Sequence, residues 1–146
     1  MQPICLVTSL MGVGTIKLRC KLQTANKFIK MPELYFVLDT GAERTSVARH
    51  ILAEHGYGKY TKASKPMHTA VGPVDMHLCQ IRGLTIANQF TYGVMQVGIL
   101  ENWKGHSVGG VIGMDILRQL TLILSHEYKK FLLTDNFVPE LAKLLC

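Results

Sequence analysis

The chain has 146 residues, of which 48% are hydrophobic and 18% are charged, and its formal net charge is +6 at pH 7. This length and composition exclude a disordered or low-complexity protein and leave no room for a second independent core. We therefore expect one domain over residues 1–146, with its core at about residues 15–135.

Patterns typical of β-strands dominate the chain, and helical patterns are few. Residues 4–7 and 15–22 predict two strands joined as a hairpin. A second hairpin, between residues 67 and 84, is expected to turn at Val71-Gly72-Pro73-Val74, because Gly and Pro together favour a turn. The other predicted elements are strands at 27–31 and 34–38, a helix at 46–55, strand structure over 83–97, an exposed loop at 101–108, a strand at 111–113, a helix at 114–120, a hairpin of strands 120–125 and 130–134, and a small amphipathic helix in the last ten residues. Together they predict an all-β domain of barrel or sandwich type with one or two short helices.

The basic residues Lys17, Arg19 and Lys21 alternate along one predicted strand and therefore share a face. Two interpretations stay open: a solvated face that discourages edge pairing, or a contact for an acidic partner. The Lys and Arg residues never form a run of five or more, and no nucleic-acid motif accompanies them, so no specific nucleic-acid partner is expected.

The spacing of the cysteines and the hydropathy of the chain indicate in which compartment the protein works and whether it binds a metal. Cys5, Cys20, Cys79 and Cys146 stand far apart without a C-x-x-C pair, which predicts free thiols in a reducing compartment. No stretch approaches the roughly eighteen apolar residues of a membrane span, and no basic residue precedes the N-terminal apolar run as in a signal peptide. We expect a cytoplasmic protein with no membrane partner, no cofactor and no metal.

Two motifs carry the chemistry. Asp39-Thr40-Gly41-Ala42 follows an apolar strand pattern and holds a carboxylate on a tight turn. About seventy residues later, Gly110-Val111-Ile112-Gly113-Met114-Asp115-Ile116-Leu117 sets a glycine turn before a short helix. In this order and spacing the motifs resemble the retropepsin-like aspartic protease family. They are more similar to its cellular and bacterial members than to the retroviral enzymes, which usually carry Arg where this chain has Met114.

This resemblance implies a closed, barrel-like acid-protease fold that is active as a two-fold homodimer. Asp39 of each subunit would activate one water between two carboxyls that share a proton, so the activity is expected to favour mildly acidic conditions. Thr40 would hydrogen-bond across the dimer axis, and Gly41 would let the substrate backbone approach. The implied activity is an aspartic endopeptidase that acts on peptide or protein substrates.

The resemblance also implies substrate-binding positions, namely Ala42, Glu43, Val71, Gly72, Ile112 and Gly113. Val71 and Gly72 lie where the family has its flap, a mobile arm that closes over bound peptide; a plain surface hairpin is the alternative. Arg44 would favour substrates with an acidic side chain, or would form an exposed pair with Glu43. Asp115 is expected to cap a helix or to make a structural hydrogen bond rather than to take part in catalysis.

Two other functions remain open. A retropepsin-like fold without proteolysis would serve as a dimerisation or peptide-binding module, and its signature would be a damaged triplet, whereas Asp39-Thr40-Gly41 is intact. A basic domain associated with nucleic acid rests on the net charge alone.

Overall fold

The structure is a computed structural model that describes residues 5–9, 15–58, 64–69 and 71–135. These residues form β-strands and two short α-helices, as the sequence predicts. The elements are β1 (Cys5–Ser9), β2 (Lys17–Leu22), β3 (Glu33–Leu38), β4 (Ser46–Ala48), α1 (Arg49–Glu54), β5 (Ser64–Thr69), β6 (Gly72–Ile81), β7 (Leu84–Ile86), β8 (Phe90–Tyr92), β9 (Met95–Leu100), β10 (Gly110–Ile112), α2 (Met114–Leu117), β11 (Thr121–Ser125) and β12 (Lys130–Thr134). Among the described residues, no helix has the length and hydrophobicity needed to span a bilayer.

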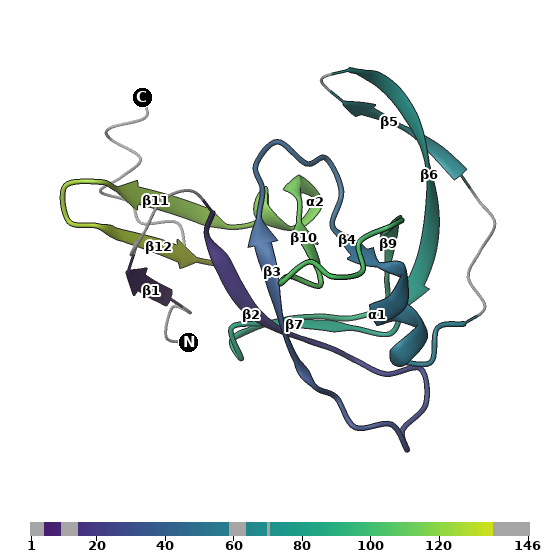
Figure 1. Ribbon diagram of the computed structural model, residues 1–146. Helices are drawn as coiled ribbons and strands as arrows, with labels where there is room; N and C mark the ends of the chain where they lie inside the picture. The colour runs from purple at the N-terminus through teal and green to yellow at the C-terminus, as the bar shows by residue number, and fades with distance from the viewer. Residues whose placement is uncertain (1–4, 10–14, 59–63, 70, 136–146) are drawn as a thin grey trace.

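The strands form two sheets (Figure 1). A nine-stranded sheet has the order β5-β6-β9-β4-β10-β3-β2-β7-β8, and a three-stranded sheet has the order β1-β12-β11. The expected closed barrel is wrong for the described residues, because the nine-stranded order is linear and ends at β5 and β8. The β5–β6 hairpin and the small sheet lie on opposite sides of the molecule (Figure 1).

The two ends of the described chain pair with each other. β1 runs antiparallel to β12, with Cys5 opposite Thr134, so the predicted hairpin between the first two strands is wrong. The predicted hairpin of the last two strands is confirmed, with Thr121 opposite Thr134 and Ser125 opposite Lys130. The amphipathic helix predicted for the last ten residues lies outside the described residues.

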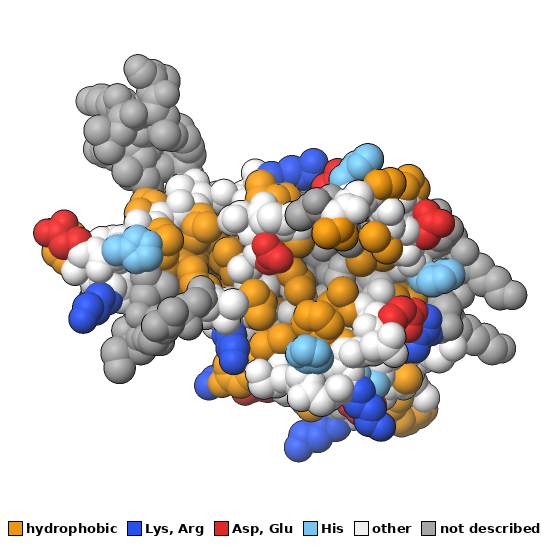
Figure 2. All heavy atoms as spheres, turned by 45° about the horizontal axis from the view of Figure 1, so that its top comes forward, with side chains coloured by type: hydrophobic (Ala, Val, Ile, Leu, Met, Phe, Trp, Pro, Cys, Tyr) orange, Lys and Arg blue, Asp and Glu red, His pale blue; other side chains and the backbone are white. Residues whose placement is uncertain are grey.

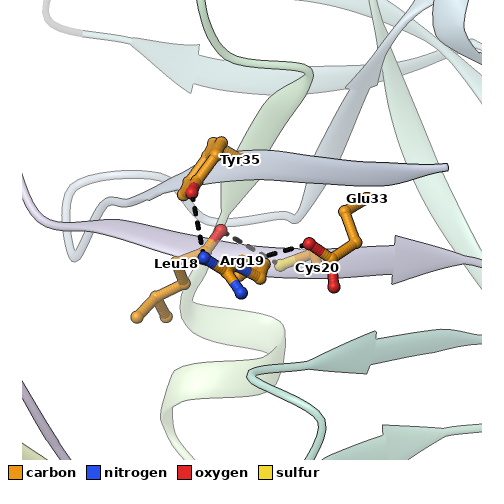
Figure 3. Close-up of polar contacts among 5 residues, drawn as sticks. All are labelled: Leu18, Arg19, Cys20, Glu33 and Tyr35. Carbon is orange, nitrogen blue, oxygen red and sulfur yellow. Dashed lines mark hydrogen bonds and ion pairs between the residues drawn. The ribbon is translucent and has the colours of Figure 1, made fainter.

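The period-two pattern of β2 divides its side chains between core and solvent. The buried side chains are Leu18, Cys20 and Leu22. Burial of a leucine side chain stabilises the folded state by roughly 1.5–3 kcal/mol relative to leaving it exposed. On the outer face, Arg19 reaches the Tyr35 hydroxyl at 3.4 Å and the Glu33 carboxylate at 3.5 Å (Figure 3). The basic strand face is therefore solvated and partly paired, in line with the simpler of its two interpretations.

The predicted helix at 46–55 begins later than expected. Ser46–Ala48 forms strand β4, which pairs with both β9 and β10 and is buried throughout, and helix α1 begins only at Arg49. Backbone pairing on both sides overrides the helical pattern in these three residues. Residues 27–31, predicted as a strand, form no strand, and residues 27–29 form a turn and a bend instead.

Candidate active site

Asp39 follows directly after β3, on a turn whose backbone is fixed. Its N–H donates to the carbonyl of Ile112 at 3.0 Å, and its own carbonyl accepts the N–H of Ala42 at 3.2 Å. The Oδ1 atom accepts the Gly41 N–H at 2.8 Å. A Cβ on Gly41 would lie 3.2 Å from this oxygen, so a larger residue would crowd the carboxylate. The turn thus holds an exposed carboxylate in one orientation.

The second motif lies beside this turn, because β10 runs parallel to β3 with Ile112 opposite Leu38. Beyond β10 the chain stays attached to the first motif. The Met114 N–H donates to the carbonyl of Ala42 at 2.7 Å, and the Asp115 N–H donates to the carbonyl of Glu43 at 3.2 Å. Backbone hydrogen bonds therefore tie the two motifs together along their length.

Asp115 holds this junction with its side chain. Its Oδ1 accepts the Thr45 N–H at 2.8 Å, the Thr45 hydroxyl at 2.7 Å and the Ile116 N–H at 3.0 Å. The buried Thr45 oxygen in turn accepts the Gly113 N–H at 3.1 Å. A Cβ on Gly113 would lie 2.5 Å from the Arg44 carbonyl carbon, so only glycine allows this close crossing. Asp115 thus makes the structural hydrogen bonds that the sequence predicts for it.

A pocket of about 270 Å³ opens beside the Asp39 carboxylate. Figure 2 looks onto the molecule from the side where β3 ends, and hydrophobic side chains gather in the middle of this face. The residues that line the pocket are Asp39, Gly41, Ala42, Glu43, Arg44, Ser46, His68, Met76, Leu100 and Val111.

The pocket brings together some of the predicted site residues and leaves out others. Asp39, Gly41, Ala42 and Glu43 line it, and Thr40 is exposed next to them. Ile112 is completely buried and meets the site through its carbonyl, and Gly113 lies behind the turn against Arg44. Val71 is 94% exposed, and neither it nor Gly72 lines the pocket.

The β5–β6 hairpin reaches the pocket through residues other than the predicted ones. Thr69 pairs with Gly72, so β6 already begins at Gly72, earlier than a turn at Val71-Gly72-Pro73-Val74 suggests, and Pro73 belongs to β6 opposite His68. His68 and Met76 line the pocket, and the Met76 sulfur lies 3.7 Å from the Ser46 hydroxyl. The hairpin that the sequence predicts is therefore present, with its turn displaced.

Several site residues have only weak signals in the sequence. Met76 could have been found from the alternation of β6, where Met76 and Leu78 point inward. His68 and Leu100 come to the pocket through strand pairings that no local pattern reveals. Thr45 links Asp115 to Gly113 through hydrogen bonds. In the sequence it stands between the charged Arg44 and the polar Ser46, so it looks like an ordinary loop residue.

Arg44 is the one arginine that lines the Asp39 pocket. Its side chain is half-buried. Among the described residues, its guanidinium forms no ion pair with a carboxylate. Of the two alternatives for Arg44, the one in which it pairs with Glu43 is therefore not observed as an ion pair in the described residues.

Comparisons with known proteins agree with this geometry. A family model described as aspartyl protease matches residues 29–116, which is more than half of the chain and includes the Asp39 turn. No curated protein matches the chain. The structure is similar to that of a retropepsin-like aspartic protease from Rickettsia conorii, with a TM-score of 0.62, 12% identity, and coverage of 91% of this chain and 92% of that one. A retroviral protease-like domain of Ddi1 from Leishmania major gives a TM-score of 0.48 at 13% identity, covering 80% and 85% of the two chains. The similarity to the Rickettsia structure confirms the retropepsin-like fold expected from the sequence.

Proposed function

The chain belongs to the aspartyl protease family, and from this premise we propose that it is an endopeptidase whose active form is a homodimer. Asp39 of each subunit supplies one of two carboxyls that activate a water molecule. The observation that carries this proposal is the exposed Asp39 carboxylate, held by the Gly41 N–H at 2.8 Å beside an open pocket.

The need for a second subunit comes from the count of suitable carboxyls. Metal-free hydrolysis of a peptide through a bound water requires one carboxyl to accept a proton while another donates one. Asp115, the acid of the second motif, already accepts three hydrogen bonds with its Oδ1. Glu43 lines the Asp39 pocket, but the two side chains form no hydrogen bond in the described structure. A two-fold axis at the exposed turn supplies the missing carboxyl from a second Asp39.

In this dimer the two Asp39 carboxyls share one proton, because two negative charges so close together are unfavourable. The ionised carboxyl takes a proton from the water as it attacks the peptide carbonyl. The protonated carboxyl hydrogen-bonds to the carbonyl oxygen as charge develops there. The proton that was taken from the water then passes to the leaving nitrogen, and the C–N bond breaks without a covalent enzyme intermediate.

We assign different roles to the other predicted site residues. Thr40 and Gly41 lie on the exposed turn, where Thr40 pairs with its symmetry mate and Gly41 leaves space for the substrate backbone. Ala42 and Glu43 line the pocket and contact the substrate. Ile112 and Gly113 support the turn from behind, since Ile112 is buried and Gly113 lies against Arg44.

The β5–β6 hairpin is proposed to close over bound peptide. It already contributes His68 and Met76 to the pocket, while the Val71 and Gly72 end of the hairpin stands clear of it. Closure would bring this end over the substrate and exclude water from the reaction.

The experiment that tests this function measures cleavage of a diverse peptide pool between about pH 4 and pH 7, with Asp39→Asn and Glu127→Gln beside the unchanged chain. Glu127 lies on the exposed turn between β11 and β12, so Glu127→Gln is a matched change of acid to amide outside the site. If Asp39→Asn abolishes cleavage and Glu127→Gln does not, the result supports the proposed endopeptidase activity. If no chain cuts a peptide while the folded protein binds peptides from the pool, the alternative of a catalytically silent peptide-binding module is correct.

A further inference from the structure

A second pocket, larger than the one beside Asp39, lies on a different part of the surface. Its volume is about 360 Å³, and it shares no lining residue with the Asp39 pocket. Its walls come from the end of β2, the loop that follows β2, the turn between β6 and β7, and strands β7 and β8. Pockets of roughly 300–1,000 Å³ are typical of sites for small molecules.

Three cationic residues line this pocket, and they come from three separate segments. Lys21 comes from β2, Lys27 from the loop after it, and Arg82 from the turn before β7. Of the described residues that line the pocket, none is acidic. Several like charges around one pocket raise its positive potential and therefore favour the binding of an anion there.

Two acids lie near residues of the pocket without lining it. Glu33 lies opposite Lys21 across the strand pair, but its carboxylate is 3.5 Å from the Arg19 guanidinium (Figure 3). Asp135 is close enough to Tyr92 to contribute, after burial, to the raised pKa of that phenol, but it is not part of the pocket wall. The positive charge of the pocket is therefore not neutralised by its own lining.

The walls are fixed before any ligand binds. Arg82 donates from Nη1 to the Ala25 carbonyl at 3.2 Å, and its backbone N–H donates to the Tyr57 hydroxyl at 3.0 Å. The loop is held by the Ala25 N–H, which donates to the His55 carbonyl at 2.9 Å, and by the Thr24 hydroxyl, which donates to the Asn26 carbonyl at 2.7 Å. A preformed site loses little conformational entropy when a ligand binds.

From these observations we propose that this pocket is a binding site for a small organic phosphate. A phosphate monoester carries a charge of about −1.5 to −2 at neutral pH, which matches three cations better than the single charge of a carboxylate does. Ile29, Met31 and Leu84 also line the pocket, and such apolar side chains suit the organic part of the ligand.

The test is an NMR titration of the ¹⁵N-labelled chain at low salt with phenyl phosphate, inorganic phosphate and benzoate. Phenyl phosphate is expected to shift the amides of Gly83, Thr85 and Thr91 saturably and to bind more tightly than either other probe, because only it combines the dianion with a ring. Equal binding of benzoate, no saturable shift, or shifts spread over the whole surface would overturn the proposal. A phosphoserine peptide that binds more tightly than phenyl phosphate would also overturn it, in favour of a protein partner.

Matched variants distinguish binding at this pocket from non-specific attraction of the anion to the positively charged protein. Lys21→Gln combined with Lys27→Gln should weaken phenyl phosphate binding about tenfold or more, since hydrogen bonds to charged groups are individually strong. Lys129→Gln combined with Lys130→Gln changes the net charge equally at the far β11–β12 turn and should leave the affinity within about twofold. An equal loss in both double variants contradicts the proposal. Unchanged amide shifts outside the pocket show that each variant is folded.

Discussion

The segments that follow two neighbouring parallel strands each carry an aspartate, one on a turn and one in helix α2, and the two carboxylates have opposite surroundings. Asp39, after β3, is exposed and accepts one N–H from its own turn. Asp115, after β10, accepts three hydrogen bonds, two of them from the buried Thr45. The comparison teaches that the sequence position of an acid after a strand does not decide its role. The donors that surround the carboxylate decide it.

The two turns also depend on each other. The Thr45 and Asp115 network holds the segment that leaves the Asp39 turn, and the Ile112 carbonyl holds the Asp39 backbone. One acid fixes the geometry, and the other stays exposed at a fixed place, as the catalytic role proposed for Asp39 requires.

The largest expected effect is on activity and separates the two acids. Asp39→Asn should lower kcat/KM by about 10²–10⁴-fold or more, because it removes a general acid and base. It should hardly change the free energy of unfolding, since the side chain is exposed and Asn retains an oxygen for the Gly41 N–H. Kinetics and urea denaturation on the same preparations check both halves of this prediction.

Asp115→Ala should have the reverse profile, with a large loss of stability. It leaves the Thr45 N–H and hydroxyl without their acceptor in a buried place, which costs about 3 kcal/mol or more. Asp115→Asn keeps an acceptor oxygen and should cost less. Urea denaturation measures both, and a fully stable but inactive Asp115→Ala would break the comparison by making Asp115 catalytic.

Gly113→Ala tests the close crossing between the two turns. Its Cβ would lie 2.5 Å from the Arg44 carbonyl carbon, and the strain should lower the free energy of unfolding by about 1–3 kcal/mol. Gly93→Ala is the matched control, because a Cβ there meets nothing within 4 Å, and it should change stability by less than about 0.5 kcal/mol. Equal effects of the two substitutions would contradict the packing described for Gly113.

The smallest effect concerns Glu101, an acid that is paired but near the surface. The hydrogen bond from Arg49 lowers the pKa of Glu101, so the pair adds stability above the ordinary carboxyl pKa and loses it as pH falls through the lowered value. Glu101→Gln should cost less than about 1 kcal/mol near pH 7. Thermal melts across pH check the sign, since the difference from the unchanged chain should vanish in acid and should not grow there.

The parts of this molecule that the sequence predicts are local ones. Asp39-Thr40-Gly41-Ala42, the turn at Gly113 and the final hairpin are each encoded within a few residues, and all are present. What the sequence does not predict depends on distant pairing. β1 joins β12 rather than β2, and Ser46–Ala48 becomes a strand because β9 and β10 flank it.

The candidate site divides in the same way. Asp39, Ala42 and Glu43 reach the pocket from one continuous motif and are predictable. His68 and Met76 come from a hairpin whose turn is displaced from the Gly-Pro signal, so the residues at the expected tip stand clear of the pocket. Register is set by pairing along both strands, and a turn motif alone does not fix it.

The most direct test of the central claim, that two subunits each supply one Asp39, mixes the active chain with an excess of Asp39→Asn. The two chains are denatured together and refolded at a fixed concentration of active chain, with a Glu127→Gln excess as the control. Random pairing with a ninefold excess leaves about one tenth of the active chains in fully active dimers. We therefore predict that activity, divided by the concentration of all chains that carry Asp39, falls to about one tenth with Asp39→Asn and stays constant with Glu127→Gln. Unchanged activity in the presence of excess Asp39→Asn would show that one chain is sufficient and would contradict the account.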